Sequence, residues 1–123
     1  MRSLVQRKGS RVPQAWLVLS DPDFHPVMSK LTGWSLVVFG SRACGSCRAM
    51  RRAIGELPSG IVERMVDVDA ELAPGLVDEL EIFHLPALFL WCDGEDWAEL
   101  TSPPRVAELV QCIQSAKQGP CRD

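Results

Sequence analysis

The residues best suited to chemistry in this sequence are two cysteines three positions apart, Cys44 and Cys47. In the first turn of a helix such a pair has Cβ atoms roughly 5 to 6 Å apart, close enough for a disulfide to form after small rotations. The helix N-terminus and nearby guanidinium groups favour an anion, so we expect the pKa of Cys44 to lie below that of free cysteine. The spacing therefore predicts a dithiol that opens and closes by thiol-disulfide exchange.

The helical period gives the two cysteines different surroundings. The face of Cys47 is apolar, and the face of Cys44 is basic; the first carries Met50 and Ile54, the second Arg48 and Arg51. We therefore expect Cys47 to point at the core and Cys44 to point outward. Arg48 is a candidate supporting residue, whereas the pattern leaves Arg51 and Arg52 open between a functional role and solvated surface charge.

Two predicted elements position this pair. Residues 36–39 form an apolar, β-branched and aromatic run that ends at Gly40, which is typical of a buried strand. After Cys47, apolar residues recur at spacings of three and four, which predicts a helix that Pro58 and Gly60 end. The dithiol is therefore expected at a turn from a strand into a helix.

The rest of the chain alternates between strand-like and helix-like segments. Strands are predicted at residues 15–19, 61–69, 83–92 and 95–100, and further helices at about 21–32, 73–82 and 103–117. Asp93 and Gly94 between two strand-like runs are typical of a hairpin turn, and the acidic residues after them favour an edge strand. The order of elements indicates a mixed sheet covered by helices on both faces.

A strand, Cys-Gly-Ser-Cys at a helix start, a second strand-helix unit, and Leu85-Pro86 opening a later apolar run resemble the thioredoxin superfamily over about residues 15–117. The resemblance implies an α/β fold, a three-layer sandwich with a mixed central sheet of four to five strands and helices on both faces. It also implies a cis peptide bond before Pro86, which faces the dithiol. Gly45, Ser46, Leu85 and Pro86 would then line the groove that receives a substrate.

The resemblance implies a thiol-disulfide oxidoreductase, a disulfide reductase of protein substrates. Cys44 is the expected nucleophile and Cys47 the expected resolving residue. The implied partners are a protein disulfide and a thioredoxin-reductase-like or other dithiol electron donor, with no cofactor and no metal.

Three departures from the family pattern keep a second function open. Ala43 replaces the usual Trp before the first cysteine, and Val38 occupies the place of a buried acid. The lysine often found near that acid falls at about Met65. Because an internal base for Cys47 is missing in this reading, the alternative is a thioredoxin-like binding or chaperone and assembly module with little turnover.

Metal binding is a third reading, in which Cys44 and Cys47 supply two thiolates and Cys92 or a second subunit the rest. The sequence holds no second Cys-x-x-Cys or Cys-x-x-His pair at usable spacing, which disfavours it. Cys92 and Cys112 are predicted to be small core side chains, and Cys121 a free thiol in the tail. His84 is interpreted as a turn residue or a base near the site, and His25 as structural.

Composition is that of one ordinary domain. The chain has 123 residues, 46% of them hydrophobic, a net charge of −3 and a pI near 5.4. A single core is expected, and nucleic acid is excluded as the main partner by the lack of a basic field. Residues 1–14 are predicted to be a basic flexible tail, 15–117 the domain and 118–123 a flexible tail. With no secretory signal and no membrane span expected, a cytoplasmic monomer or weak dimer is predicted.

Overall fold

The structure, a computed structural model, describes residues 16–119. Its elements are β2 (Trp16–Leu19), α1 (Asp21–Met28), β3 (Trp34–Gly40), α2 (Gly45–Gly55), β4 (Arg64–Asp69), the short 3-10 helix η1 (Ala70–Leu72), α3 (Pro74–Glu79), β5 (Ala87–Cys92), β6 (Glu95–Leu100) and α4 (Val106–Gln118). The predicted tails, 1–14 and 118–123, lie outside these residues except for Gln118, which is the last residue of α4, and Gly119. No helix within the described residues is long and apolar enough to cross a membrane.

The five strands form one mixed sheet in the order β2-β4-β3-β5-β6. β2, β4 and β3 run parallel to one another, and β5 and β6 are antiparallel to their neighbours. Asp93 and Gly94 have φ values of 52° and 83°, the left-handed conformation that a tight hairpin turn requires. The predicted hairpin and the edge position of β6 are therefore confirmed.

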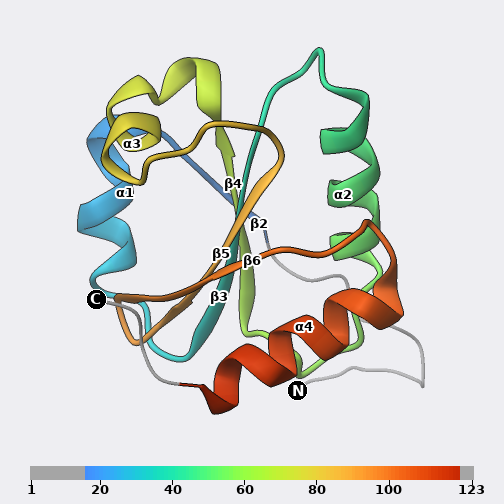
Figure 1. Cartoon of the computed structure of the whole chain (residues 1–123). Helices are drawn as coiled ribbons and strands as arrows, with labels where there is room; N and C mark the ends of the chain where they lie inside the picture. The colour runs from blue at the N-terminus through green and yellow to red at the C-terminus, as the bar shows by residue number, and fades with distance from the viewer. Residues whose placement is uncertain (1–15, 120–123) are drawn as a thin grey trace, which may run out of the picture.

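Figure 1 shows this sheet between two helical layers, with α1 and α3 on one face and α2 and α4 on the other. Because side chains alternate along a strand, β3 contributes to both layers. Leu36 and Val38 pack in the cluster under α2 and α4, and Val37 and Phe39 in the cluster under α1 and α3. The α/β sandwich expected from the sequence is confirmed.

Several boundaries differ from those predicted: β4 begins at Arg64 rather than at residue 61, α3 ends at Glu79 rather than near residue 82, and three further differences have a local reason. α1 ends at Met28 rather than near Gly33, because the amides of Lys30 and Leu31 bond to carbonyls only three residues back and tighten the chain. β5 begins at Ala87 rather than at Phe83, because Pro86 has no N–H for the sheet and Phe83 is 88% exposed. α4 begins after Pro104, with Arg105 as its N-cap.

The layer that holds α1 and α3 is joined by polar contacts. The two carboxylate oxygens of Asp21 accept hydrogen bonds from the backbone N–H groups of Gly75 and Leu76, each 2.9 Å long. These are the amides that the first turn of a helix leaves unpaired, so α1 caps α3. His25 Nε2 lies 2.9 Å from Glu79 Oε2 and links the same two helices.

Candidate redox site

The dithiol lies where the central strand passes into α2. β3 is buried from Ser35 to Gly40 and delivers the chain to a short exposed turn, after which Cys44 is the N-cap of α2. The Sγ of Cys44 accepts the backbone N–H of Cys47 at 3.1 Å, so the sulfur takes the place of a capping oxygen. The two cysteines form a disulfide with Cα atoms 5.2 Å apart.

The two sulfur-bearing side chains differ in exposure. Cys47 is fully buried, at 0% exposed, and Cys44 is half-buried at the mouth of the turn. This is the asymmetry predicted from the faces of the helix. A solvent-accessible sulfur with a shielded mate lets one atom meet a partner while the other stays in reserve.

Polar groups around Cys44 favour an anion there. The hydroxyl of Ser46 lies 3.2 Å from Cys44 Sγ and can donate to it. The first turn of α2 carries no acidic residue, and its free amides add partial positive charge. Arg48 is exposed nearby, with its Nη1 donating to the carbonyl oxygen of Arg42 at 3.1 Å.

Arg51 departs from the outward position that its spacing from Cys44 suggests. Its Nε and Nη2 lie 2.9 and 2.8 Å from Oδ1 of Asp67 on β4. The two side chains are only 25% and 26% exposed, so this pair lies against the sheet. Arg52, in contrast, is exposed. Of the two arginines left open by the sequence, one is therefore bound into the structure beside the dithiol.

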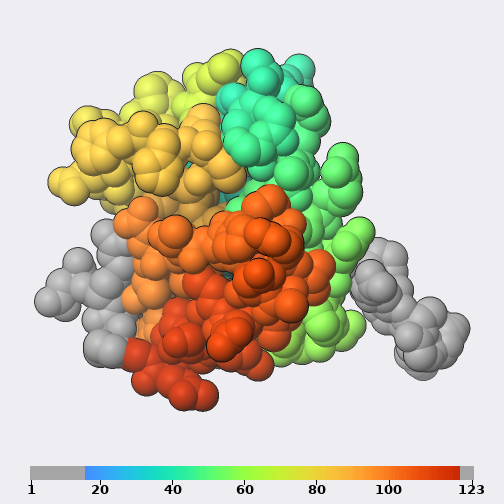
Figure 2. Space-filling model, turned by 45° about the vertical axis from the view of Figure 1, so that its right-hand side comes forward, coloured from blue at the N-terminus to red at the C-terminus, as the bar shows by residue number. Residues whose placement is uncertain are grey.

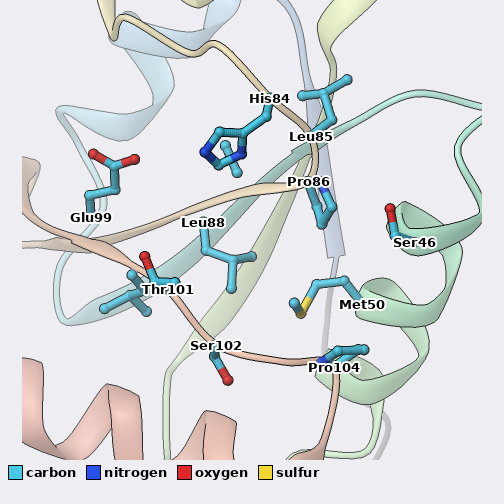
Figure 3. A pocket seen from close by; sticks show the side chains of 12 residues that line it. Ser46, Met50, His84, Leu85, Pro86, Leu88, Glu99, Thr101, Ser102 and Pro104 are labelled. Atoms are coloured by element: carbon cyan, nitrogen blue, oxygen red, sulfur yellow. The ribbon is translucent and has the colours of Figure 1, made fainter.

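A groove opens next to the dithiol, between α2 and the segment before β5. The peptide bond between Leu85 and Pro86 is cis, as the resemblance implied. The cavity has a volume of about 280 Å³, and its lining residues are Ser46, Met50, His84, Leu85, Pro86, Ala87, Leu88, Glu99, Leu100, Thr101, Ser102 and Pro104. Figure 3 shows Ser46 and Met50 on α2 facing the segment of Leu85 and Pro86. Figure 2 shows the start of α2 (teal) beside that segment (yellow to orange).

Of the four residues expected to line the groove, Ser46, Leu85 and Pro86 line this cavity, whereas Gly45 is exposed and is not among its lining residues. The sequence reasoning missed the far wall, which comes from the end of β6 and the residues after it, such as Thr101. The hairpin signal at Asp93 and Gly94 could have revealed this wall, because an antiparallel return strand brings residues after position 99 back beside the start of β5.

Val38 is completely buried in the apolar cluster with Met50 and Met65, so the central strand supplies no acid at this place. Its neighbour in the register on β4 is Asp67, and Met65 pairs instead with Leu36. The nearest acidic side chain on the sheet is therefore one strand away from the position that the resemblance points to.

The remaining candidates lie apart from the dithiol or at its edge. His84 is exposed and lines the groove, and Cys121 lies outside the described residues. Cys92 and Cys112, predicted to be core side chains, are half-buried, and Cys112 packs against the core. Among residues 16–119, no group of three or more His, Cys, Asp and Glu side chains is placed to hold a metal ion.

The chain is similar to known proteins in sequence and in fold. The family model for thioredoxin matches residues 15–115. A thioredoxin of Aspergillus fumigatus is 26% identical over 100 residues, covering 80% of this chain and 92% of the fungal protein. Two solved structures are each 18% identical to this chain. A mutant thioredoxin from Halobacterium salinarum has a TM-score of 0.69, and the match covers 90% of this chain and 98% of that one. Thioredoxin f from spinach chloroplasts has a TM-score of 0.71, and the match covers 89% of this chain and 99% of that one. The match over most of its length, the fold and the paired cysteines show that the chain belongs to the thioredoxin family.

Proposed function

We propose that this protein is a thiol-disulfide oxidoreductase that reduces disulfides in protein substrates through Cys44 and Cys47. The observation that carries the proposal is the unequal pair at the start of α2. The Sγ of Cys44 is accessible and accepts the Cys47 N–H, while Cys47 is fully buried one turn further on. An accessible sulfur at a helix N-terminus is the one whose thiolate is favoured.

In the first step the Cys44 thiolate attacks one sulfur of a substrate disulfide. A bond forms between Cys44 Sγ and that sulfur, and the substrate disulfide breaks. The second substrate sulfur leaves with the bonding electron pair and takes up a proton. The product is a mixed disulfide between the protein and its substrate. The Cys47 amide and the Ser46 hydroxyl are placed to stabilise the attacking thiolate.

In the second step Cys47 attacks Cys44 Sγ and releases the substrate. The bond between the two cysteines forms, the bond to the substrate breaks, and the released substrate sulfur is protonated. Two electrons have then passed from the dithiol to the substrate. Recycling requires a dithiol donor, for which we propose a thioredoxin-reductase-like protein or another dithiol.

The substrate segment is proposed to lie in the groove of about 280 Å³ beside Pro86. Ser46, Leu85 and Pro86 form its near wall, with Gly45 at the edge. Arg48 is the proposed supporting cation. The proposed compartment is the cytoplasm, where cellular dithiols keep the pair reduced, and the proposed state is a monomer or weak dimer.

The test is reduction of insulin disulfides with a chemical dithiol as electron donor. Cys44→Ser is expected to abolish turnover, and Cys47→Ser is expected to accumulate a mixed disulfide that gel electrophoresis without reductant reveals. Cys92→Ser is the control, because Cys92 ends β5, whereas the groove is lined by Ala87 and Leu88 at the start of that strand. Unchanged turnover in both active-pair variants contradicts the proposal.

A binding or chaperone module is the second candidate, and the burial of Val38 among apolar side chains favours it. Because β3 carries no acid at this position, no side chain of that strand can take the proton from Cys47 when it attacks the mixed disulfide. A pull-down from cell extract distinguishes the binding module from the oxidoreductase. A binding module retains the same partners when Cys44 and Cys47 are both replaced by Ala, whereas the oxidoreductase loses partners that it holds covalently.

A further inference from the structure

A glycine at the end of β3 leaves room for a charged group next to the buried sulfur. A Cβ atom placed on Gly40 would lie 3.0 Å from Arg51 Nη2, 3.0 Å from Cys47 Cβ and 3.1 Å from Cys47 Sγ. A side chain at this position would require Arg51 and Cys47 to shift by a few tenths of an ångström. The guanidinium of Arg51 and the sulfur of Cys47 therefore converge on the same small space beside Gly40.

Asp67 holds that guanidinium in place. Its Oδ1 accepts from both Nε and Nη2 of Arg51, and it sits on β4 in register with Val38 of β3. An arginine fixed at two nitrogens loses much of its freedom to swing into solvent. Arg51 is also four residues after Cys47 on α2, which places the two on one face of the helix.

Several other charged groups lie on the elements around Cys47, and two of them, Arg42 and Asp69, line a cavity together with Arg51. The groups are Arg42 before α2, Arg48 and Arg52 on α2, Asp69 on β4, and His84 and Glu99 at the groove. Arg48 binds the carbonyl of Arg42, and Asp69 Oδ1 accepts the N–H of Glu71. The described contacts thus single out Arg51 as the cation beside the buried sulfur.

A second cavity reaches this pair from outside. It has a volume of about 300 Å³ and is lined by Val18, Arg42, Arg51, Asp67, Asp69 and Leu72. It shares no lining residue with the substrate groove. Its lining includes Arg51 and Asp67 but not Cys47, so solvent in this cavity can reach the ion pair while a substrate occupies the groove.

We propose that Arg51 stabilises the Cys47 thiolate in the resolving step, and that Asp67 is the residue that positions Arg51. The proposal rests on the proposed function. The Cys47 thiol gives its proton to water, the thiolate attacks Cys44 Sγ, and the Cys44–substrate bond breaks. The leaving substrate sulfur is reduced and protonated as the two cysteines are oxidised to their disulfide.

The step is measured with one equivalent of dithiobis(nitrobenzoic acid) and the reduced protein in a stopped-flow instrument. Attack by Cys44 releases a first coloured thiolate, and resolution by Cys47 releases a second. The Cys47→Ala variant, which keeps Cys44, identifies the second phase by its absence. Following both phases from acid to alkaline pH gives the midpoint at which each nucleophile ionises.

Arg51→Gln is expected to slow the second phase about tenfold at neutral pH and to raise its midpoint by about one unit, since one unit corresponds to a tenfold change in the thiolate fraction. Asp67→Asn keeps an Oδ1 that can accept from Arg51 but removes a negative charge, so its midpoint is expected to fall. The rate and the midpoint of the second phase in Arg51→Lys should lie between those of Arg51→Gln and wild type. The matched control is Arg52→Gln, which removes an exposed charge from the same helix and should leave both phases within about twofold.

If wild type shows both phases and Arg51→Gln leaves the midpoint of the second phase unshifted, the inference about Arg51 is overturned while the proposed function stands. Shifts of the same sign in Arg51→Gln and Asp67→Asn also overturn it, because structural damage rather than charge would then explain both. If Arg51→Gln does not fold, the downward shift in Asp67→Asn decides. If the wild-type protein shows neither phase, the proposed function is overturned as well.

Discussion

The backbone N–H of Cys47 donates to the Sγ of Cys44 at 3.1 Å, so the accessible sulfur caps the helix that carries its buried mate. This cap places the sulfur that reacts at the N-terminus of α2. A thiolate at the N-cap is stabilised by the free amides of the first turn. The same atom is therefore a structural acceptor and the proposed nucleophile.

Ser46 is the side chain whose removal should alter Cys44 with least effect on the fold. Its exposed hydroxyl lies 3.2 Å from Cys44 Sγ. Ser46→Ala is expected to move the alkylation of Cys44 to higher pH, because a partly solvated hydrogen bond to the thiolate is lost. The pH dependence of alkylation by iodoacetamide measures this, with Ser59→Ala in the exposed loop after α2 as the control. An equal shift in both variants would contradict the assigned contact.

The groove should matter for proteins and not for small disulfides. Thr101 is exposed at its far wall, so Thr101→Phe should fill part of the 280 Å³ while leaving the dithiol untouched. We expect kcat/KM for insulin to fall by about fivefold or more, which corresponds to roughly 1 kcal/mol of lost transition-state binding. Reaction of the same variant with dithiobis(nitrobenzoic acid) is the internal control. Equal losses with both disulfides would place substrate binding elsewhere.

Two phenylalanines offer a matched test of the core. Phe24 is fully buried, with its ring centroid 5.4 Å from that of Trp91, whereas Phe83 is 88% exposed. Phe24→Ala is expected to lower the free energy of unfolding by about 3 to 5 kcal/mol, and Phe83→Ala to change it by less than about 0.5 kcal/mol. Urea unfolding followed by tryptophan fluorescence provides both values. A large loss with Phe83→Ala would mean that the segment before β5 packs differently.

Most of the fold could be predicted because local patterns and the sheet agree. The run at 36–39, the hairpin signal at Asp93 and Gly94, and the helical spacing after Cys47 each depend on neighbours in the sequence. The same rules misplaced the end of α1 and the start of β5, where the chain leaves regular structure. Short irregular segments such as η1 follow from turn geometry, which apolar spacing does not encode.

The candidate site was predictable only in part. Cys44, Ser46 and Pro86 follow from the motif and the resemblance. The pairing of Arg51 with Asp67 does not, since it depends on the register of β4 beside β3 and on the small size of Gly40. The Thr101 wall likewise depends on where the hairpin returns. Contacts between side chains distant in sequence are set by packing, and one sequence contains no signal that fixes them.

A redox titration of the Cys44 and Cys47 pair against glutathione, followed by mass spectrometry of alkylated protein, tests the central claim most directly. The account predicts a reversible two-electron couple between these two cysteines, with a potential at or below the cytosolic glutathione poise of roughly −220 to −260 mV. A pair that never oxidises, or a potential far above that range, would contradict a disulfide reductase built on this dithiol.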